Sequence, residues 1–205
     1  MARETSHWLG YTPADWQPTF DAGARVLDVG CGQGGQLRRL LDTGARPAGI
    51  DAWREPLSAC RAHALPVAQA RAEQLPFQDR TFDGIVCNVV LPYTDEHRVI
   101  REIGRILKSG GRGYIVSHAV GYYTRYLVAP PEWKLRVYAA RALANSWVWA
   151  LAGSRLPGFL GDTIYQSRGR LRRDYAAAGL VLEREVAGRT FMGLPVFFHH
   201  QVRKP

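Results

Sequence analysis

Cysteine and lysine are both scarce in this sequence of 205 residues. Its three cysteines, Cys31, Cys60 and Cys87, are an odd number without the paired spacing of a zinc site, so a disulfide-stapled scaffold is excluded and no metal is expected. The most apolar stretch, residues 142–152, is interrupted by polar residues and is shorter than the ~20 residues of a membrane-spanning helix. Because the first residues also lack the apolar core of a signal peptide, we expect a cytoplasmic protein.

Acidic residues are few in the second half of the chain. The net charge of +9 divides into about +1 for residues 1–113 and +8 for residues 114–205, and 24 of the 27 cations are arginine. A basic surface of this kind is typical of proteins that meet RNA, an anionic membrane or an acidic substrate. An arginine-rich composition without any such partner gives the same count, so both interpretations stay open.

Apolar segments alternate with helical patterns over residues 25–117. Buried strands are predicted at 25–30, 47–51, 66–70, 82–90 and 113–117, with helices at 36–42, 55–64 and 96–107. Residues 119–162 break the alternation and predict one or two inserted helices. A helix at 164–178 and strands at 180–186 and 195–202 follow, and these two strands can pair as a hairpin. We therefore predict one α/β domain over residues 1–205, Rossmann-like and doubly wound, with a mostly parallel seven-stranded sheet and an antiparallel last strand.

The segment Val26–Gly35 (VLDVGCGQGG) is the most informative in the chain. Its glycines predict a sharp turn from strand to helix in which the backbone approaches a ligand closely. The spacing also satisfies a dinucleotide fingerprint, with Asp51 placed to hold a ribose, so an NAD-dependent oxidoreductase is one alternative. Asp28 argues against it, because a carboxylate before the first glycine would repel a pyrophosphate and attract a cation.

The pattern Asp28-x-Gly30-x-Gly32-x-Gly34 resembles the first motif of class I S-adenosylmethionine-dependent methyltransferases. Further segments agree in order: Gly49-Ile50-Asp51, residues 70–77 (ARAEQLPF), Phe82-Asp83 and residues 107–112 (LKSGGR). The resemblance covers residues 24–117 and is closest to the small-molecule enzymes of ubiquinone and menaquinone biosynthesis. It implies S-adenosylmethionine as cofactor, without a metal.

The resemblance also implies the cofactor-binding residues. Asp28 would serve the methionine end of the cofactor, Asp51 both ribose hydroxyls, and Ala52, Trp53, Ala72 and Glu73 the adenine. The full expected set is Asp28, Gly30, Cys31, Gly32, Gly34, Asp51, Ala52, Trp53, Ala72, Glu73, Asn88 and Val89.

A general base is useful but not obligatory for methyl transfer, because a sulfonium methyl group is already activated. His118, just after the fifth strand, and Tyr93, just after the fourth, are the candidates, and each has a structural interpretation beside the catalytic one. We treat the Cys31 side chain as steric.

The aromatic segments 1–22 and 119–162 are expected to form a lid over a small, hydrophobic or aromatic acceptor. The function predicted is methyl transfer to an oxygen, nitrogen or carbon atom of that acceptor. The alternatives are the NAD-dependent oxidoreductase, a partner subunit without transfer activity and, less favoured, an RNA methyltransferase. Basic and aromatic residues in 119–162 also permit peripheral contact with an anionic membrane.

Overall fold

The computed structural model describes residue 13 and residues 16–205. The helices are α1 (Gly35–Asp42), α2 (Arg54–Ala62), α3 (Glu96–Ile106), α4 (Val120–Val128), α5 (Trp133–Ala152) and α6 (Arg168–Ala177). The strands are β1 (Arg25–Val29), β2 (Arg46–Asp51), β3 (Val67–Gln69), β4 (Phe82–Asn88), β5 (Leu107–His118), β6 (Val181–Val186), β7 (Thr190–Phe191), β8 (Leu194–Pro195) and β9 (Phe197–Arg203).

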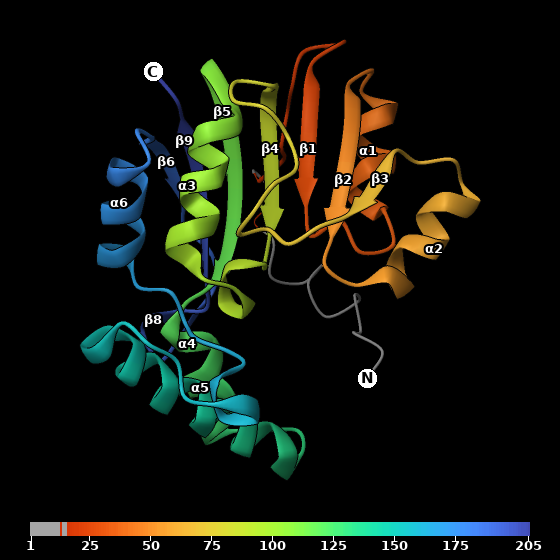
Figure 1. The fold of residues 1–205 in the computed structure, drawn as a ribbon. Coiled ribbons are helices and arrows are strands. Elements are labelled where there is room, and N and C mark those ends of the chain that lie inside the picture. The colour runs from red at the N-terminus through yellow and green to blue at the C-terminus, as the bar shows by residue number, and fades with distance from the viewer. Residues whose placement is uncertain (1–12, 14–15) are drawn as a thin grey trace.

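A seven-stranded sheet in the order β3-β2-β1-β4-β5-β9-β6 forms the centre of the molecule (Figure 1). Strands β1 to β5 are parallel, whereas β9 pairs antiparallel with both β5 and β6. The strand order reverses between β1 and β4, and ligands of open parallel sheets bind outside such a point. The doubly wound fold and the pairing of the last two long strands are confirmed.

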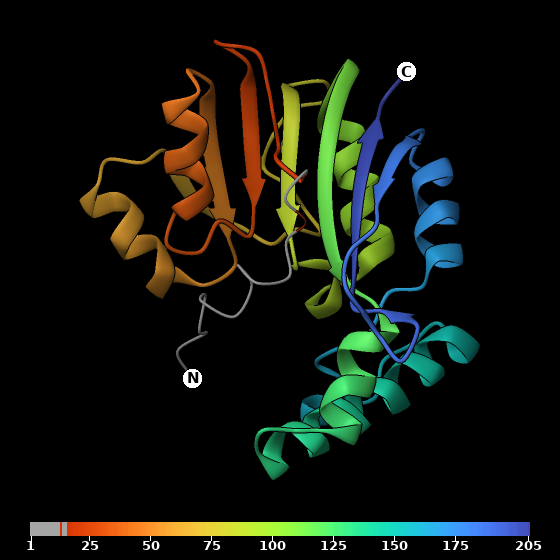
Figure 2. The ribbon, with the colours of Figure 1, turned by 180° about the vertical axis from the view of Figure 1, so that it is seen from behind.

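Apolar side chains cover both faces of this sheet. On one face, α3 and α6 pack their buried residues against β1, β4 and β5 in the largest apolar cluster. On the other, Leu40 of α1 packs against β1 and β4, and Figure 2 shows α1 on this side. Strands β1 and β4 are therefore buried on both faces, which is why their sequences are nearly continuous apolar runs.

Two aromatic residues before β1, Trp16 and Phe20, pack against the core. Trp16 is buried against Tyr114 and His199, and the Phe20 ring lies on β4 so closely that a Cβ at Gly84 would stand 2.1 Å from it. These two rings were expected in a lid over the acceptor and instead fix the chain to the sheet. The other expected lid aromatics of this segment, Trp8 and Tyr11, lie outside the described residues.

Two helices form the insertion after β5, as predicted. Figures 1 and 2 show α4 and α5 as a separate layer below the carboxyl ends of the strands. Tyr123, Tyr126, Ala139 and Ala142 join the two helices in a cluster of their own. Within the described residues, no helix combines the length and apolar character needed to cross a bilayer.

Candidate functional site

The turn between β1 and α1 has the backbone that its glycines predict. Gly30, Gly32 and Gly34 have φ values of +76°, +52° and +80°, in the left-handed region that favours glycine. A Cβ at Gly30 would stand 2.4 Å from Cγ2 of Val90, whereas one at Gly32 would meet no atom within 4 Å. The backbone at Gly32 therefore faces open space, into which a ligand can come close.

Asp51, the last residue of β2, holds this turn in place. Its Oδ2 accepts a hydrogen bond from the Gly32 N–H at 3.0 Å, and its Oδ1 accepts one from the Trp53 N–H at 2.9 Å. The carboxylate thus joins the glycine turn to the start of α2. Each oxygen keeps a lone pair for a ligand hydroxyl, since a carboxylate accepts about four hydrogen bonds.

Asp28 lies beside Asp51 in an almost fully buried position. It pairs with Gly49 of β2 and Val86 of β4 in the sheet, and it is 2% exposed. Burial, and secondly the charge of Asp51, raise the pKa of Asp28 to about 7. A cationic group at this place would favour the ionised carboxylate, whereas a pyrophosphate would oppose it.

The ends of the neighbouring strands carry the other expected contacts. Asn88 is exposed at the end of β4, and Val89 after it has a φ of +58°, which is strained for a β-branched residue. Glu73 is held by Arg71, whose guanidinium donates to its Oε1 at 3.2 Å, and Ala72 is buried. Trp53 is 64% exposed, so its ring can cover a ligand.

Cys31, within the glycine turn, is buried. Its side chain packs with Leu37, Leu57, Cys60 and Leu65 between α1 and α2. Burial raises the pKa of the thiol well above its ordinary value. This arrangement agrees with the steric role expected for Cys31.

His118 and Tyr93 meet at the carboxyl ends of β5 and β4. His118 is fully buried; its Nδ1 lies 2.9 Å from the hydroxyl of Tyr123, and its ring stacks on Tyr122 with 3.8 Å between centroids. Burial lowers the pKa of His118 to about 3, so the imidazole is neutral at physiological pH. Tyr93 lies edge-on to it, 6.2 Å away, and is 37% exposed.

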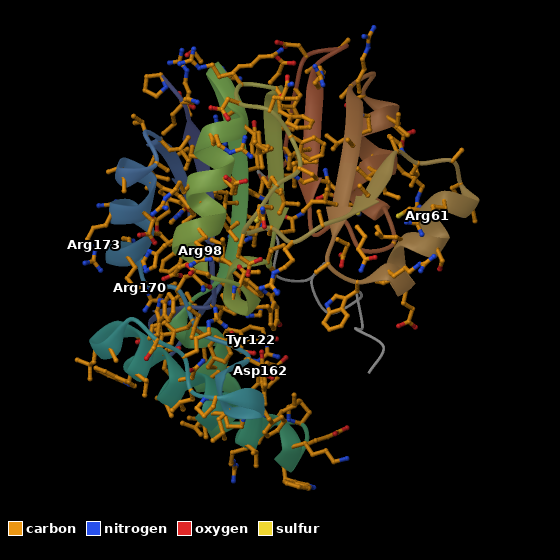
Figure 3. All side chains as sticks on the ribbon, in the orientation of Figure 1. Arg61, Arg98, Tyr122, Asp162, Arg170 and Arg173 are labelled. Carbon is orange, nitrogen blue, oxygen red and sulfur yellow. The ribbon has the colours of Figure 1, made fainter. Side chains whose placement is uncertain are left out.

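A buried ion pair next to this region was not found from the sequence. Oε1 of Glu96, at the start of α3, accepts from Arg170 Nε at 2.6 Å and from Trp149 Nε1 at 3.3 Å. Glu96 is 0% and Arg170 7% exposed, and Arg170 also donates to the Tyr165 carbonyl. Figure 3 shows Arg170 where α6 meets the α4–α5 layer. The pair therefore connects α3, α5 and α6.

The same neighbourhood contains a group of possible metal ligands. Ligand atoms of Glu96, His97 and Asp174 lie within 4.8 Å of one another, and His97 Nδ1 is 2.6 Å from Asp174 Oδ1. Because the Arg170 guanidinium already neutralises Glu96, we interpret the group as an ion-pair network. The expectation that the protein uses no metal stays a prediction.

Comparison with known proteins shows which family this site resembles. A family model described as a methyltransferase domain matches residues 27–115, the stretch that contains the glycine turn, Asp28, Asp51 and β4. Residues 27–115 are thus similar to the methyltransferase domains of this family. The family resemblance inferred from the sequence motifs is confirmed.

Individual proteins resemble this chain either over part of its sequence or in overall fold. A ubiquinone biosynthesis O-methyltransferase of Aeromonas salmonicida is 35% identical over 104 residues, which are 45% of this chain and 42% of that protein. The chain thus covers less than half of the length of this relative. An S-adenosylmethionine-dependent methyltransferase of Mesorhizobium loti shares the fold at a TM-score of 0.66 and 19% identity, over 91% of this chain and 93% of its own. The [4+2]-cyclase SpnF also shares the fold, at a TM-score of 0.62 and 22% identity, over 91% of this chain and 77% of its own.

Proposed function

We propose that the chain binds S-adenosylmethionine at the carboxyl ends of β1, β2 and β4 and transfers its methyl group to a small acceptor. The observation that carries this proposal is the buried pair of Asp28 and Asp51 beneath a glycine turn whose backbone faces open space. A second carboxylate close to Asp51 is costly unless a cation compensates it. A sulfonium ligand with an amino group brings that compensation.

Each residue of the site then has a definite task. Asp28 would face the positively charged methionine end, and the free lone pairs of Asp51 would accept from two ribose hydroxyls. Glu73, Ala72 and Trp53 would border the adenine. Since the cofactor supplies a methyl group that is already activated, the residues of the chain would chiefly orient the acceptor and exclude water.

The acceptor would lie between the ends of β4 and β5 and the helix α4. Tyr93 and Tyr122 are partly exposed there, and Figure 3 shows Tyr122 in the layer below the sheet. Their rings favour a hydrophobic or aromatic acceptor, because such pockets bind mainly through apolar area. With a pKa of about 3, His118 is a weak base, so we propose that it positions Tyr122 and Tyr123 and that Tyr93 forms a wall of the pocket.

Calorimetric titration with S-adenosylmethionine, S-adenosylhomocysteine and NAD tests the binding part. Asp51→Asn should weaken S-adenosylmethionine binding by roughly 1.5–3 kcal/mol, because a charged acceptor for two hydroxyls is lost. Asp42→Asn, at an exposed position of α1, is the matched control and should bind like the parent. Binding of NAD alone, or unchanged binding by Asp51→Asn, would refute the placement.

A transfer assay separates the enzyme from the alternative of an inactive partner subunit. The protein, labelled S-adenosylmethionine and a panel of phenols, catechols and amines should give a labelled product. Cofactor binding without product from any member would favour the subunit. Labelled RNA would favour the RNA methyltransferase.

Part of the positive charge of the second half lies in ion pairs within the molecule. Arg141 pairs with Asp162 at 2.6 Å, Arg168 with Glu185 at 2.7 Å, and Arg170 with the buried Glu96. These three arginines are therefore engaged within the molecule and are not free to meet RNA or an anionic membrane. Membrane contact and a cytoplasmic location stay predictions.

A further inference from the structure

The outer face of α5 carries an apolar stripe at regular spacing. Its members are Trp133, Val137, Ala140, Ala144, Trp147 and Leu151, separated by alternating steps of four and three residues. Steps of four and three keep side chains on one side of a helix over its whole length, as in the seam of a coiled coil. Trp133 is 71%, Trp147 63% and Leu151 84% exposed.

This apolar stripe, called the seam below, is not needed to hold α5 on the rest of the protein. Helix α5 is anchored through its opposite face, where Ala139, Ala142, Asn145, Ser146 and Trp149 are buried. Two of these make fixed polar contacts: Asn145 donates to the Thr163 carbonyl, and the Ser146 hydroxyl accepts from the Tyr165 N–H. The helix is thus held rigidly while a second apolar face points to solvent, and exposed patches of this kind mark interaction sites.

The seam is complementary to itself. Its six positions are symmetric about residue 142, so a second copy running antiparallel would place Trp133 opposite Leu151 and Val137 opposite Trp147. Ala140 and Ala144 would face each other at the centre, where their small side chains let the helices approach. A two-fold interface requires a surface that matches itself in this way. We propose that α5 pairs antiparallel with α5 of a second copy of this chain.

The charges beside the seam permit this pairing. Lys134 and Arg136 would lie near Val148 and Ala150 of the second copy, where their aliphatic stems can cover apolar surface. The two Arg141 side chains would approach each other at the two-fold axis, but Arg141 is 11% exposed and neutralised by Asp162. No like charges therefore meet without compensation.

These features favour a second copy over an anionic membrane. A helix that lies on anionic lipid has cations along its polar flanks. On α5 the cations are confined to residues 134–141, and the part from 142 to 152 has none. The seam is also narrow and has tryptophans near its ends, a composition common in protein interfaces.

The exposed apolar area of the seam sets the expected affinity of the dimer. The two indoles, Val137 and Leu151 present on the order of 500 Å² of apolar surface in each copy. With the flanking stems, pairing would bury a total near the ~1,200 Å² at the lower end of specific interfaces. The dissociation constant of the dimer should therefore lie in the micromolar range.

Sedimentation velocity of the full chain from about 1 to about 100 µM tests the proposal. The parent should shift from monomer to dimer over this range, and Trp147→Glu should remain monomeric, with a dissociation constant raised at least tenfold. Leu41→Glu, an equivalent change at an exposed position of α1, is the control and should dimerise like the parent. Unchanged circular dichroism would show that both variants are folded.

Cysteine cross-linking tests the antiparallel register. Because the native cysteines are buried, a disulfide between copies would come from introduced thiols. A mixture of Ala140→Cys and Ala144→Cys should give the mixed disulfide in excess over either homodimer. A parent that stays monomeric at every concentration overturns the proposal, as does an excess of the homodimers. A third result would also overturn it: the parent binds phosphatidylglycerol vesicles but does not dimerise, and Trp147→Glu no longer binds the vesicles. A lipid would then be the partner.

Discussion

Replacing Asp28 by asparagine should stabilise the cofactor-free protein and weaken its affinity for S-adenosylmethionine. The carboxyl is 2% exposed, and its pKa is raised from 3.8 to about 7. The folded protein therefore binds more protons than the unfolded chain between these values, and its stability falls as the pH rises through this window. At about 1.4 kcal/mol per pKa unit, the loss of folding stability approaches ~4 kcal/mol above pH 7.

Asparagine does not ionise, so the Asp28→Asn variant should escape this loss. Its free energy of unfolding should exceed that of the parent by roughly 2–4 kcal/mol above pH 8 and by about zero near pH 4, and its Tm should be higher by roughly 4–16 °C in the alkaline range. Urea unfolding of the cofactor-free proteins over a pH series measures the difference. Asp42→Asn controls for the removal of one negative charge.

Cofactor binding should show the opposite effect. A sulfonium cation near Asp28 favours the carboxylate, so binding below pH 7 should release a proton, and the parent's affinity should increase as the pH rises to 7. Calorimetry in buffers of different ionisation enthalpy counts that proton, and Asp28→Asn should release none. A variant less stable than the parent at pH 8, or one with the same proton release, would refute this account of Asp28.

Three further predictions concern the turn, the ion pair and the imidazole. Gly30→Ala should cost about 1–3 kcal/mol of stability, because φ is +76° and the methyl group would overlap Val90; adding Val90→Ala should restore part of it in urea unfolding. Arg170→Leu should cost about 3–5 kcal/mol by leaving the Glu96 charge buried alone, and adding Glu96→Gln should recover much of this, whereas equal losses would contradict a charge effect. The His118 ring, assigned by NMR against His118→Gln, should not titrate between about pH 5 and 9, and a midpoint near 6.5 would contradict its burial.

The parts of the site that the sequence predicts are local in the chain. Glycines in a strand-to-helix turn determine their own backbone angles, and an acidic residue at the end of a strand must lie at the carboxyl edge of the sheet. The positions of Gly30, Asp28 and Asp51 follow from such rules. The direction of the Cys31 side chain does not, because it depends on packing against α2.

The parts that were missed depend on distant residues. Glu96 and Arg170 are 74 positions apart, and no local pattern in the sequence joins them. Similarly, the strand predicted at 113–117 begins at Leu107 as β5, because the Gly110 N–H donates to the Lys204 carbonyl near the end of the chain. Helix α6 begins at Arg168, four residues later than expected, because Ser167 caps it and the Ile164 and Gln166 N–H groups bond to the Pro92 and His118 carbonyls.

The position of β9 has a consequence for the order of folding. Among the strands that the structure describes, β6 pairs only with β9, and β9 pairs with β5, about 90 residues earlier in the sequence. Strands β1 to β5 can associate as soon as they have been synthesised, but β6 has no neighbour until residues 197–203 emerge from the ribosome. Such long-range pairing is slow. The half of the sheet that supports α6 and its arginine therefore closes last, with the open edge of β5 exposed until then.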